Sequence, residues 1–477
     1  MADMVTSPRR ATIDPLKHSP ALGGAMAFLG LHRTMPLVHG SQGCAAFAKS
    51  LLTRHFREPI PMQTTALTQV TTVLGGGGAL AEALATITAE HTPAVIGLLT
   101  TGLTEVSGDD TATEVSQFAA SHDGPDDPVV IHASTPDFKG GMQDGWAAAT
   151  QAMVSTCAEP GPVVNGQVNI LAGPALSPLD VEELRLLVEA FGLDAVVIPD
   201  LAGSLDGHLA DRWSALTTGG TTVADLRRSG FSQATLATGS AVSRAAETLE
   251  KLCGVPALVY DRLSGLESVD ALVSDLADIS GRSVPRGVRR WRQRLADGLL
   301  DTHFVLGGVR VALALEPDLL LAVGSLMADV GAEIVTAVSP TRSRVLGRLP
   351  VPEVVVGDLA DFEQRSADGG AELVIGSSHV GRVAEQLDVP HLRMGFPVYD
   401  RLAAQLRLGA GYRGSLSLLA DAANCLLEHR GTRHGASLHV KGARAGDTCS
   451  APFDSPGTPL PIPGETGSHV TKEVSSC

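Results

Sequence analysis

The sequence contains few cysteines, and none of them form a close pair. No CxxC motif and no tight group of cysteine and histidine residues occurs, so the chain encodes neither a self-contained zinc site nor a ferredoxin-type cluster. A metal site built on one of its thiolates would need ligands from another chain. The six cysteines lie at positions 44, 157, 253, 425, 449 and 477.

Long apolar runs and strong basic clusters are also missing. No segment offers about 18 uninterrupted apolar residues, and residues 1–20 lack the apolar core of a signal peptide. The formal charge of −16 argues against a nucleic-acid surface, and the richest basic stretch, 286–294, is explained by a solvated helix face. We therefore expect a cytoplasmic protein that binds neither membrane nor nucleic acid.

Aromatic residues make up only 4% of the chain, whereas glycine and small apolar residues are abundant. This composition is typical of parallel sheets, whose buried strands appear as short apolar runs separated by helical patterns. Ser177 and Pro178 suit the start of one such helix, and Gly192 suits its end. We predict strands at 93–99, 128–132, 168–172, 194–199, 256–260, 309–315, 332–338, 352–357 and 371–376.

The length and the polar joints of the chain predict an α/β protein with three Rossmann-like domains and mainly parallel sheets. A chain of 477 residues can bury several cores, and polar joints near residues 165 and 301–308 divide it into comparable units. Residues from 431 onward are rich in Gly, Ser, Thr and Pro, which predicts disorder. The predicted boundaries are an N-terminal tail at 1–19, domain I with a cluster-binding loop at 20–164, domain II at 165–303, domain III at 304–430 and a disordered tail at 431–477.

The most informative motif is PLVHGSQGC, which ends at Cys44. A thiolate between Gly40 and Gly43 leaves room for a bulky inorganic cluster whose sulfides accept backbone hydrogen bonds. A helix that starts just after Cys44 would favour the thiolate through its positive end. The alternative is a small buried cysteine at a strand-to-helix turn.

Further segments extend this motif into a family resemblance. TTALTQVTTVLGGGGAL (64–80) and LLTTGLTEVSGDD (98–110) follow it in the order and spacing found in the first domain of the nitrogenase component 1 family, particularly its β-type subunits. The resemblance covers roughly residues 20–430 and implies three Rossmann-like domains in an α2β2 assembly. It continues through STPDFKGGMQDGW (134–146), PDLAGSLDGH (199–208), GSSHV (376–380) and MGFPVYDRL (394–402).

Two departures from the family pattern indicate which kind of β-type chain this is. Catalytic β subunits of this family supply three cysteines to an eight-iron interface cluster. Here the first is Cys44, whereas Met62 and Gly102 occupy the second and third positions and supply no thiolate. One thiolate from this chain and three from an α-type partner would instead suit a single [4Fe-4S] cluster, as the resemblance to the cofactor-scaffold members of the family implies.

The resemblance implies a role in assembling the nitrogenase iron–molybdenum cofactor. In that role the chain pairs with NifE in a heterotetramer, and the complex holds a NifB-derived precursor, mainly in NifE. NifH assists its maturation, and apo component 1 receives the product. Any enzymatic activity would belong to the complex. The alternatives are a catalytic β subunit of nitrogenase or of a related reductase, and a structural partner in which Cys44 is vestigial.

The remaining candidate residues have simpler structural explanations. Residues 75–78 are all glycine, but no Lys-Ser/Thr follows them, so a flexible joint is favoured over a phosphate cradle. A capped, solvated turn is favoured over a cation site at Glu105, Asp109 and Asp110. His39 suits either packing or a hydrogen bond near the cluster. Core or domain packing is the default for Cys157, Cys253, Cys425, His379, Asp400 and Arg401.

Overall fold

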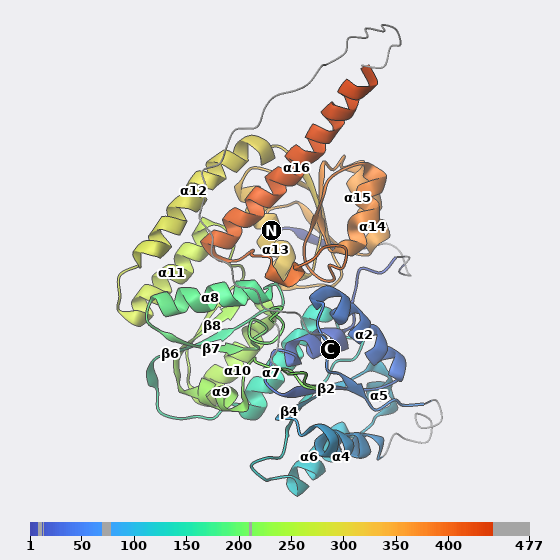
Figure 1. Cartoon of the computed structure of the whole chain (residues 1–477), viewed down its shortest axis with the longest axis vertical. Coiled ribbons are helices and arrows are strands. Elements are labelled where there is room, and N and C mark those ends of the chain that lie inside the picture. Colours follow the sequence, from blue (N-terminus) through green and yellow to red (C-terminus); the bar gives the residue numbers. More distant parts are fainter. Residues whose placement is uncertain (8–11, 13, 69–77, 209–211, 442–477) are drawn as a thin grey trace, which may run out of the picture. The chain divides into compact units, whose positions relative to one another are not determined.

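A computed structural model describes residues 1–7, 12, 14–68, 78–208 and 212–441, with side chains described up to residue 431 (Figure 1). Residues Met1–Arg430 form one compact unit. Within it, the described strands form three parallel sheets, each flanked by helices. The chain is thus an α/β protein with three Rossmann-like domains, as the sequence predicts.

The first two sheets have four strands each and the same winding. Their orders are β3-β2-β4-β5 and β7-β6-β8-β9. In both, the first strand of the domain lies between its second and third strands, so the winding direction reverses beside that first strand. The strands are β2 (Thr34–His39), β3 (Gln63–Thr64), β4 (Val95–Thr100), β5 (Val129–Ala133), β6 (Val164–Leu171), β7 (Asp194–Ile198), β8 (Ser232–Thr238) and β9 (Ala257–Tyr260).

The third sheet has six strands, in the order β1-β12-β11-β10-β13-β14. Its winding reverses between β10 and β13, as in the other two sheets. Because β1 pairs in parallel with β12, residues 3–6 belong to this sheet, and the prediction of a tail at 1–19 is wrong there. The strands are β1 (Asp3–Thr6), β10 (Arg310–Ala314), β11 (Glu333–Ser339), β12 (Glu353–Val356), β13 (Leu373–Gly376) and β14 (His391–Arg393).

Helices connect the strands and cover the sheets. The Ser177 hydroxyl caps α8 by accepting a hydrogen bond from the Asp180 amide at 3.0 Å, as the sequence predicts. The helices are α1 (Pro20–Phe28), α2 (Gln42–Phe56), α4 (Ala79–His91), α5 (Gly102–Ser107), α6 (Thr111–Ser121), α7 (Met142–Cys157), α8 (Pro178–Ala190), α9 (Val223–Arg228), α10 (Ser243–Cys253), α11 (Leu266–Ser280), α12 (Arg286–Leu306), α13 (Pro317–Asp329), α14 (Leu359–Asp368), α15 (Gly381–Leu387) and α16 (Gly411–Lys441).

Helix α16 crosses the predicted start of the C-terminal tail. The prediction places disorder from residue 431, but α16 continues to Lys441, and residues 442–477 lie outside the described part of the chain. None of the described helices is both long enough and apolar enough to cross a membrane.

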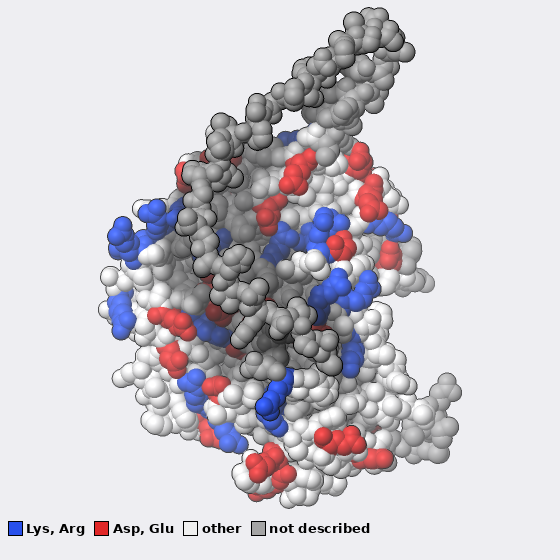
Figure 2. Space-filling view, in the orientation of Figure 1, with Lys and Arg blue, Asp and Glu red and all other residues white. Residues whose placement is uncertain are grey.

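The hydrophobic cores are shared between domains. One core joins apolar residues of the second and third domains, and another joins those of the first and second. On the face shown in Figure 2, basic and acidic side chains are interspersed. Ion pairs join some of the charged side chains, since Arg292 pairs with Asp270 and Arg413 with Glu183, both at 2.7 Å. Apolar packing therefore holds the domains together, whereas the charged side chains lie at the surface, where water solvates them.

Candidate functional site

Cys44 lies at the carboxyl end of the first strand of the first sheet, where the winding direction reverses. Strand β2 ends at His39, and α2 begins at Gln42, so Cys44 lies within the first helical turn rather than just before the helix. The thiol is exposed, and the alternative of a buried structural cysteine is therefore wrong. Ser41 Oγ lies 3.4 Å from Cys44 Sγ. The position matches the edge where open parallel sheets bind ligands.

The two glycines of the motif have different roles. A Cβ atom on Gly40 would lie 2.7 Å from the side chain of Thr101, so this position has no room for a larger residue. A Cβ atom on Gly43 would meet nothing within 4 Å. Gly40 therefore permits close packing of the loop against β4, whereas the space beside Gly43 is open next to the thiol.

Threonines hold the Cys44 loop on both sides. The Gly40 amide donates to Thr65 Oγ1 at 3.1 Å, and the Leu67 amide donates to the Gly40 carbonyl at 2.9 Å. On the other side, Thr101 Oγ1 donates to the His39 carbonyl at 3.1 Å. These hydrogen bonds connect the loop after β2 to the segments that follow β3 and β4. The loop that carries the Cys44 thiol is therefore braced by its neighbours on both sides.

The two positions where the family's catalytic β subunits carry further cysteines have other roles here. Met62 is buried and belongs to the same hydrophobic core as Ala45 and Ala48 of α2. Gly102 is the first residue of α5, directly after β4. Met62 therefore acts as a packing residue, and Gly102 offers no side chain for coordination.

Exposed apolar side chains accompany Cys44. Phe47 lies three residues after it on α2, Leu103 and Val106 lie on α5, and Phe138 is 3.7 Å from the Cβ position of Gly102. All four are exposed, Val106 to 78%. We refer to these residues as the apolar rim. Exposed apolar side chains on the elements that follow β2 and β4 suit a protein contact site, and the sequence analysis missed them because it did not separate exposed from buried apolar residues.

His39 is fully packed beneath the Cys44 loop. Its Nδ1 atom lies 3.1 Å from Thr65 Oγ1, and its Nε2 atom lies 3.4 Å from an Asp109 carboxylate oxygen. Burial lowers the pKa of His39, although Asp109 opposes this effect. His39 is therefore a buried, neutral side chain that packs at the start of the Cys44 loop.

The acidic residues after β4 have structural partners. Glu105 accepts hydrogen bonds from Thr100 and Ser134, both at 2.6 Å, and Asp110 caps α6 by accepting from the Thr113 amide at 3.1 Å. No group of three or more His, Cys, Asp or Glu residues suited to a metal occurs in the described ranges. The capped-turn interpretation therefore fits Glu105 and Asp110.

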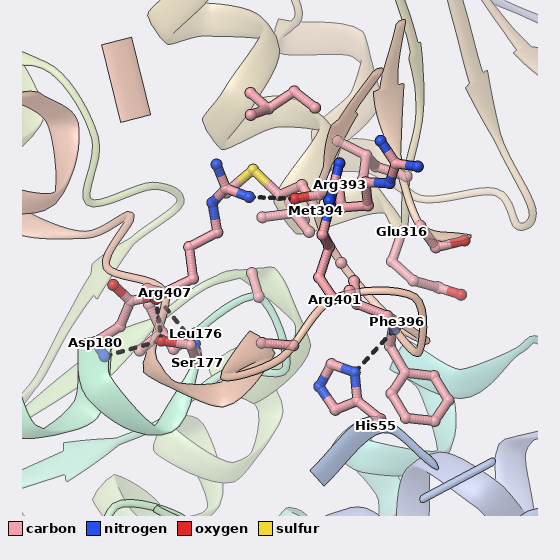
Figure 3. A pocket seen from close by; sticks show the side chains of 18 of the residues that line it. His55, Leu176, Ser177, Asp180, Glu316, Arg393, Met394, Phe396, Arg401 and Arg407 are labelled. Carbon is pink, nitrogen blue, oxygen red and sulfur yellow. Dashed lines mark hydrogen bonds between the residues drawn. The ribbon is translucent and has the colours of Figure 1, made fainter. Parts of the chain in front are cut away.

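The other candidate residues either have packing and pairing roles or line a cavity. Cys157 is buried, and burial raises its pKa to about 11, as expected for an inert core thiol. Cys253 is half-buried at the end of α10. Asp400 pairs with Arg393 at 2.9 Å, whereas Arg401 and Cys425 line a cavity to which residues of all three domains contribute (Figure 3). Gly78 precedes α4 with φ +92°, and residues 75–77 lie outside the described part.

Comparisons with known proteins agree on one family. The family described as "Nitrogenase component 1 type Oxidoreductase" matches residues 19–427. A solved structure titled "Nitrogenase Cp1 at pH 6.5" superposes with a TM-score of 0.84 at 30% identity, covering 88% of this chain and 94% of that one.

Curated relatives are similar over nearly their whole length. The nitrogenase iron-molybdenum cofactor biosynthesis protein NifN of Nostoc sp. is 44% identical over 89% of this chain and 96% of that protein. The proteins of the same name from Bradyrhizobium diazoefficiens and Klebsiella pneumoniae are 42% and 37% identical, over 90% and 92% of this chain. With the matching fold and the family match over most of its length, the chain belongs to the nitrogenase component 1 family.

Proposed function

We propose that this chain is a β-type subunit of a scaffold complex for biosynthesis of the nitrogenase iron–molybdenum cofactor. In this proposal Cys44 supplies one ligand to a [4Fe-4S] cluster shared with an α-type partner, NifE. The observation that carries the proposal is the exposed Cys44 thiol on a braced loop beside the apolar rim. The names of the similar curated proteins support the biosynthetic role.

The residues around Cys44 fit a shared cluster. A cubane takes four thiolate ligands, and the described ranges contain no group of three or more His, Cys, Asp or Glu residues that could hold a metal. A partner chain would therefore supply the rest. The open space beside Gly43 leaves room for a bulky group next to the thiol. When bound, such a cluster supplies one-electron transfer between the subunits.

The apolar rim supports an interface at the same place. A cluster whose ligands come from two chains requires those chains to meet around it. Phe47, Leu103, Val106 and Phe138 would lose their exposure to water when a partner covers Cys44, and apolar burial of this kind stabilises association. Cys44, the proposed ligand, and Phe47, part of the proposed contact surface, thus lie on the same helix.

Met62 and Gly102 favour the scaffold role over a catalytic β subunit. An eight-iron interface cluster would require thiolates at these positions, but the first holds a buried thioether and the second has no side chain. In the proposed complex, the NifB-derived precursor is held mainly by NifE, matures with the help of NifH, and passes to apo component 1. This chain completes the shared cluster and the assembly surface.

The decisive experiment compares the wild-type chain with Cys44→Ala, each co-purified with the α-type partner. We expect the wild-type complex to contain iron and to give the paramagnetic resonance signal of a reduced cubane. In the variant we expect loss of that signal and of the corresponding iron, because the other described cysteines lie on α7, α10 and α16 and not on the loop after β2.

Cys253→Ala is the matched control, since Cys253 is half-buried and lies at the end of α10 in the second domain. This variant should keep the iron and the signal. An unchanged iron content in the Cys44→Ala complex would contradict the assignment of Cys44 as a cluster ligand. Acetylene reduction by the wild-type complex with its reductase would instead support the catalytic alternative.

A further inference from the structure

Ser41 occupies the N-cap position of α2 but does not cap the helix. Its backbone angles, φ −73° and ψ 152°, are those of an ordinary N-cap residue, yet within the described residues its hydroxyl group makes no hydrogen bond to a first-turn amide. The serines at this position of two other helices do make one. Ser19 accepts from the Leu22 amide at 3.3 Å, and Ser177 accepts from the Asp180 amide at 3.0 Å. The hydroxyl of Ser41 therefore has a use other than capping.

The Ser41 hydroxyl is directed at the Cys44 sulfur instead. Ser41 Oγ lies 3.4 Å from Cys44 Sγ, within reach of a hydrogen bond to an atom as large as sulfur. A serine N-cap commonly binds the amide of the third helical residue, which in α2 is Cys44. Here that amide donates to the Ser41 carbonyl oxygen at 3.2 Å. Because the amide already has a partner, the hydroxyl is available to the sulfur.

Cys44 also occupies the position that completes a capping box in other helices. In α8 the carboxylate of Asp180 accepts a hydrogen bond from the Ser177 amide at 2.9 Å. In α9 the carboxylate of Asp225 accepts one from the Thr222 amide at 3.0 Å. The described first turn of α2 contains no acidic residue, and a thiol takes the place of the carboxylate. The positive end of α2 therefore acts on the sulfur without a neutralising carboxylate in the same turn.

A sulfur that ligates iron can only accept the hydrogen bond from Ser41. In the free thiol either group could be the donor. A thiolate bound to iron carries no proton, so the hydroxyl must donate and the sulfur must accept. Hydrogen bonds to the sulfurs are among the factors that set the reduction potential of iron–sulfur sites, because they stabilise the more negative, reduced state.

The hydroxyl is held in place by the structure of the loop itself. Ser41 is half-buried, whereas residues 42–44 are exposed. Gly40, directly before Ser41, is fixed because its amide donates to Thr65 Oγ1 and its carbonyl oxygen accepts from the Leu67 amide. The donor is thus positioned before any cluster binds, while the exposed residues leave space for the cluster and for a partner chain.

We propose that Ser41 is a positioning residue of the shared cluster, which donates a hydrogen bond to the Cys44 sulfur, stabilises the reduced state and so raises the reduction potential. This inference rests on the proposed function, because it requires Cys44 to ligate the cluster. It adds that this chain sets how readily the complex accepts an electron. A purely structural Ser41 would affect the stability of α2 and leave the potential unchanged.

The test is a redox titration of the complex of this chain with its α-type partner, monitored by paramagnetic resonance, with a low-potential chemical reductant as the electron donor. We expect Ser41→Ala to keep its iron content, because Ser41 is not a ligand. At a fixed potential the ratio of reduced to oxidised cluster should fall about tenfold, because one hydrogen bond to the sulfur is lost. For a one-electron couple this is a midpoint shift of about 59 mV to lower potential. Ser41→Thr restores a hydroxyl and should give a midpoint close to that of the wild type.

Ser50→Ala is the matched control, since Ser50 is an exposed serine of the same helix, six residues beyond Cys44. Its midpoint should equal that of the wild type. Three outcomes would overturn this inference and leave the ligand role of Cys44 intact: a Ser41→Ala midpoint equal to or above that of Ser50→Ala, an equally large shift in Ser41→Thr, or loss of iron from Ser41→Ala. A wild-type complex with neither iron nor signal would instead contradict the proposed function, and this inference with it.

Discussion

The chemical role of a single residue in this chain depends on its surroundings more than on its residue type. Cys44 and Cys157 are both free thiols, yet the first is exposed beside the apolar rim and the second lies in a core that raises its pKa to about 11. The pKa of a thiol rises where burial disfavours the thiolate, so only the exposed one is suited to an external group.

Glu316 provides a residue-scale prediction. Burial, followed by the nearby charges of Asp144 and Asp318, raises its pKa to about 8, so the folded chain binds a proton that the unfolded chain releases above its ordinary value of 4.5. Its contribution to stability is therefore full below about pH 4.5 and declines as the pH rises toward 8, by up to about 1.4 kcal/mol per pH unit. We expect Glu316→Gln to raise the urea midpoint of unfolding at pH 8.

The exposed Glu385 of α15 is the control for this measurement, and Glu385→Gln should leave the midpoint unchanged at every pH. A Glu316→Gln midpoint that stays at or below the wild-type value at pH 8 would contradict the burial argument.

Elements pack closely where glycine removes a side chain. Helices α1 and α7 touch through their backbones, since a Cβ atom on Gly145 would lie 1.7 Å from the Pro20 carbonyl oxygen and one on Gly23 would lie 1.8 Å from that of Met142. Two helices can approach this closely only without Cβ atoms at the contact. The helix after β5 is thereby held against the helix before β2.

This contact leads to an element-scale prediction. Gly145→Ala should force α1 and α7 apart and lower the free energy of unfolding by at least about 1–3 kcal/mol, the usual cost of overpacking. Gly287→Ala, in α12, meets nothing within 4 Å and should stabilise the chain by up to about 1 kcal/mol through helix propensity. Urea titration of both variants checks the pair, and a neutral Gly145→Ala would show that the contact is not tight.

At the scale of the whole molecule, the domains are joined by cores and by buried polar contacts. His55, at the end of α2 in the first domain, accepts a hydrogen bond from the Val398 amide of the third domain at 2.9 Å. Its ring also meets Phe396 edge-on, with centroids 4.9 Å apart. The helix that presents Cys44 at one end is therefore tied to the third domain at the other.

This contact between the first and third domains leads to a prediction about the stability of the fold at acidic pH. Burial lowers the pKa of His55 to about 4, so the unfolded chain binds a proton at pH values where the folded chain does not. The stabilisation is full above about pH 6.5 and is lost as the pH falls toward 4, amounting to about 3 kcal/mol. We expect His55→Asn to reduce the pH dependence of the urea midpoint in this window.

His91→Asn, at the end of α4, is the control and should retain the wild-type pH dependence. If His55→Asn and the wild type lost stability in parallel between pH 6.5 and 4, His55 would not be a titrating group of the junction.

The sequence alone determined what depends on local pattern. Each predicted strand run corresponds to a strand, because a short apolar run at a parallel-sheet position is buried by its own composition. The motif around Cys44 and the replacements at Met62 and Gly102 were likewise readable residue by residue, because ligand chemistry depends on residue type. The cap at Ser177 was readable for the same reason.

Tertiary structure alone decided what depends on contacts between distant segments. Strand β1 has no strong pattern of its own and forms because β12, about 350 residues later, offers an edge. The apolar rim combines residues of α2, α5 and the loop before α7, and the cavity lined by Arg401 combines segments as far apart in the sequence as His55 and Ser177. Burial, pKa and the direction of a side chain arise from the whole packed chain, and no local pattern encodes them.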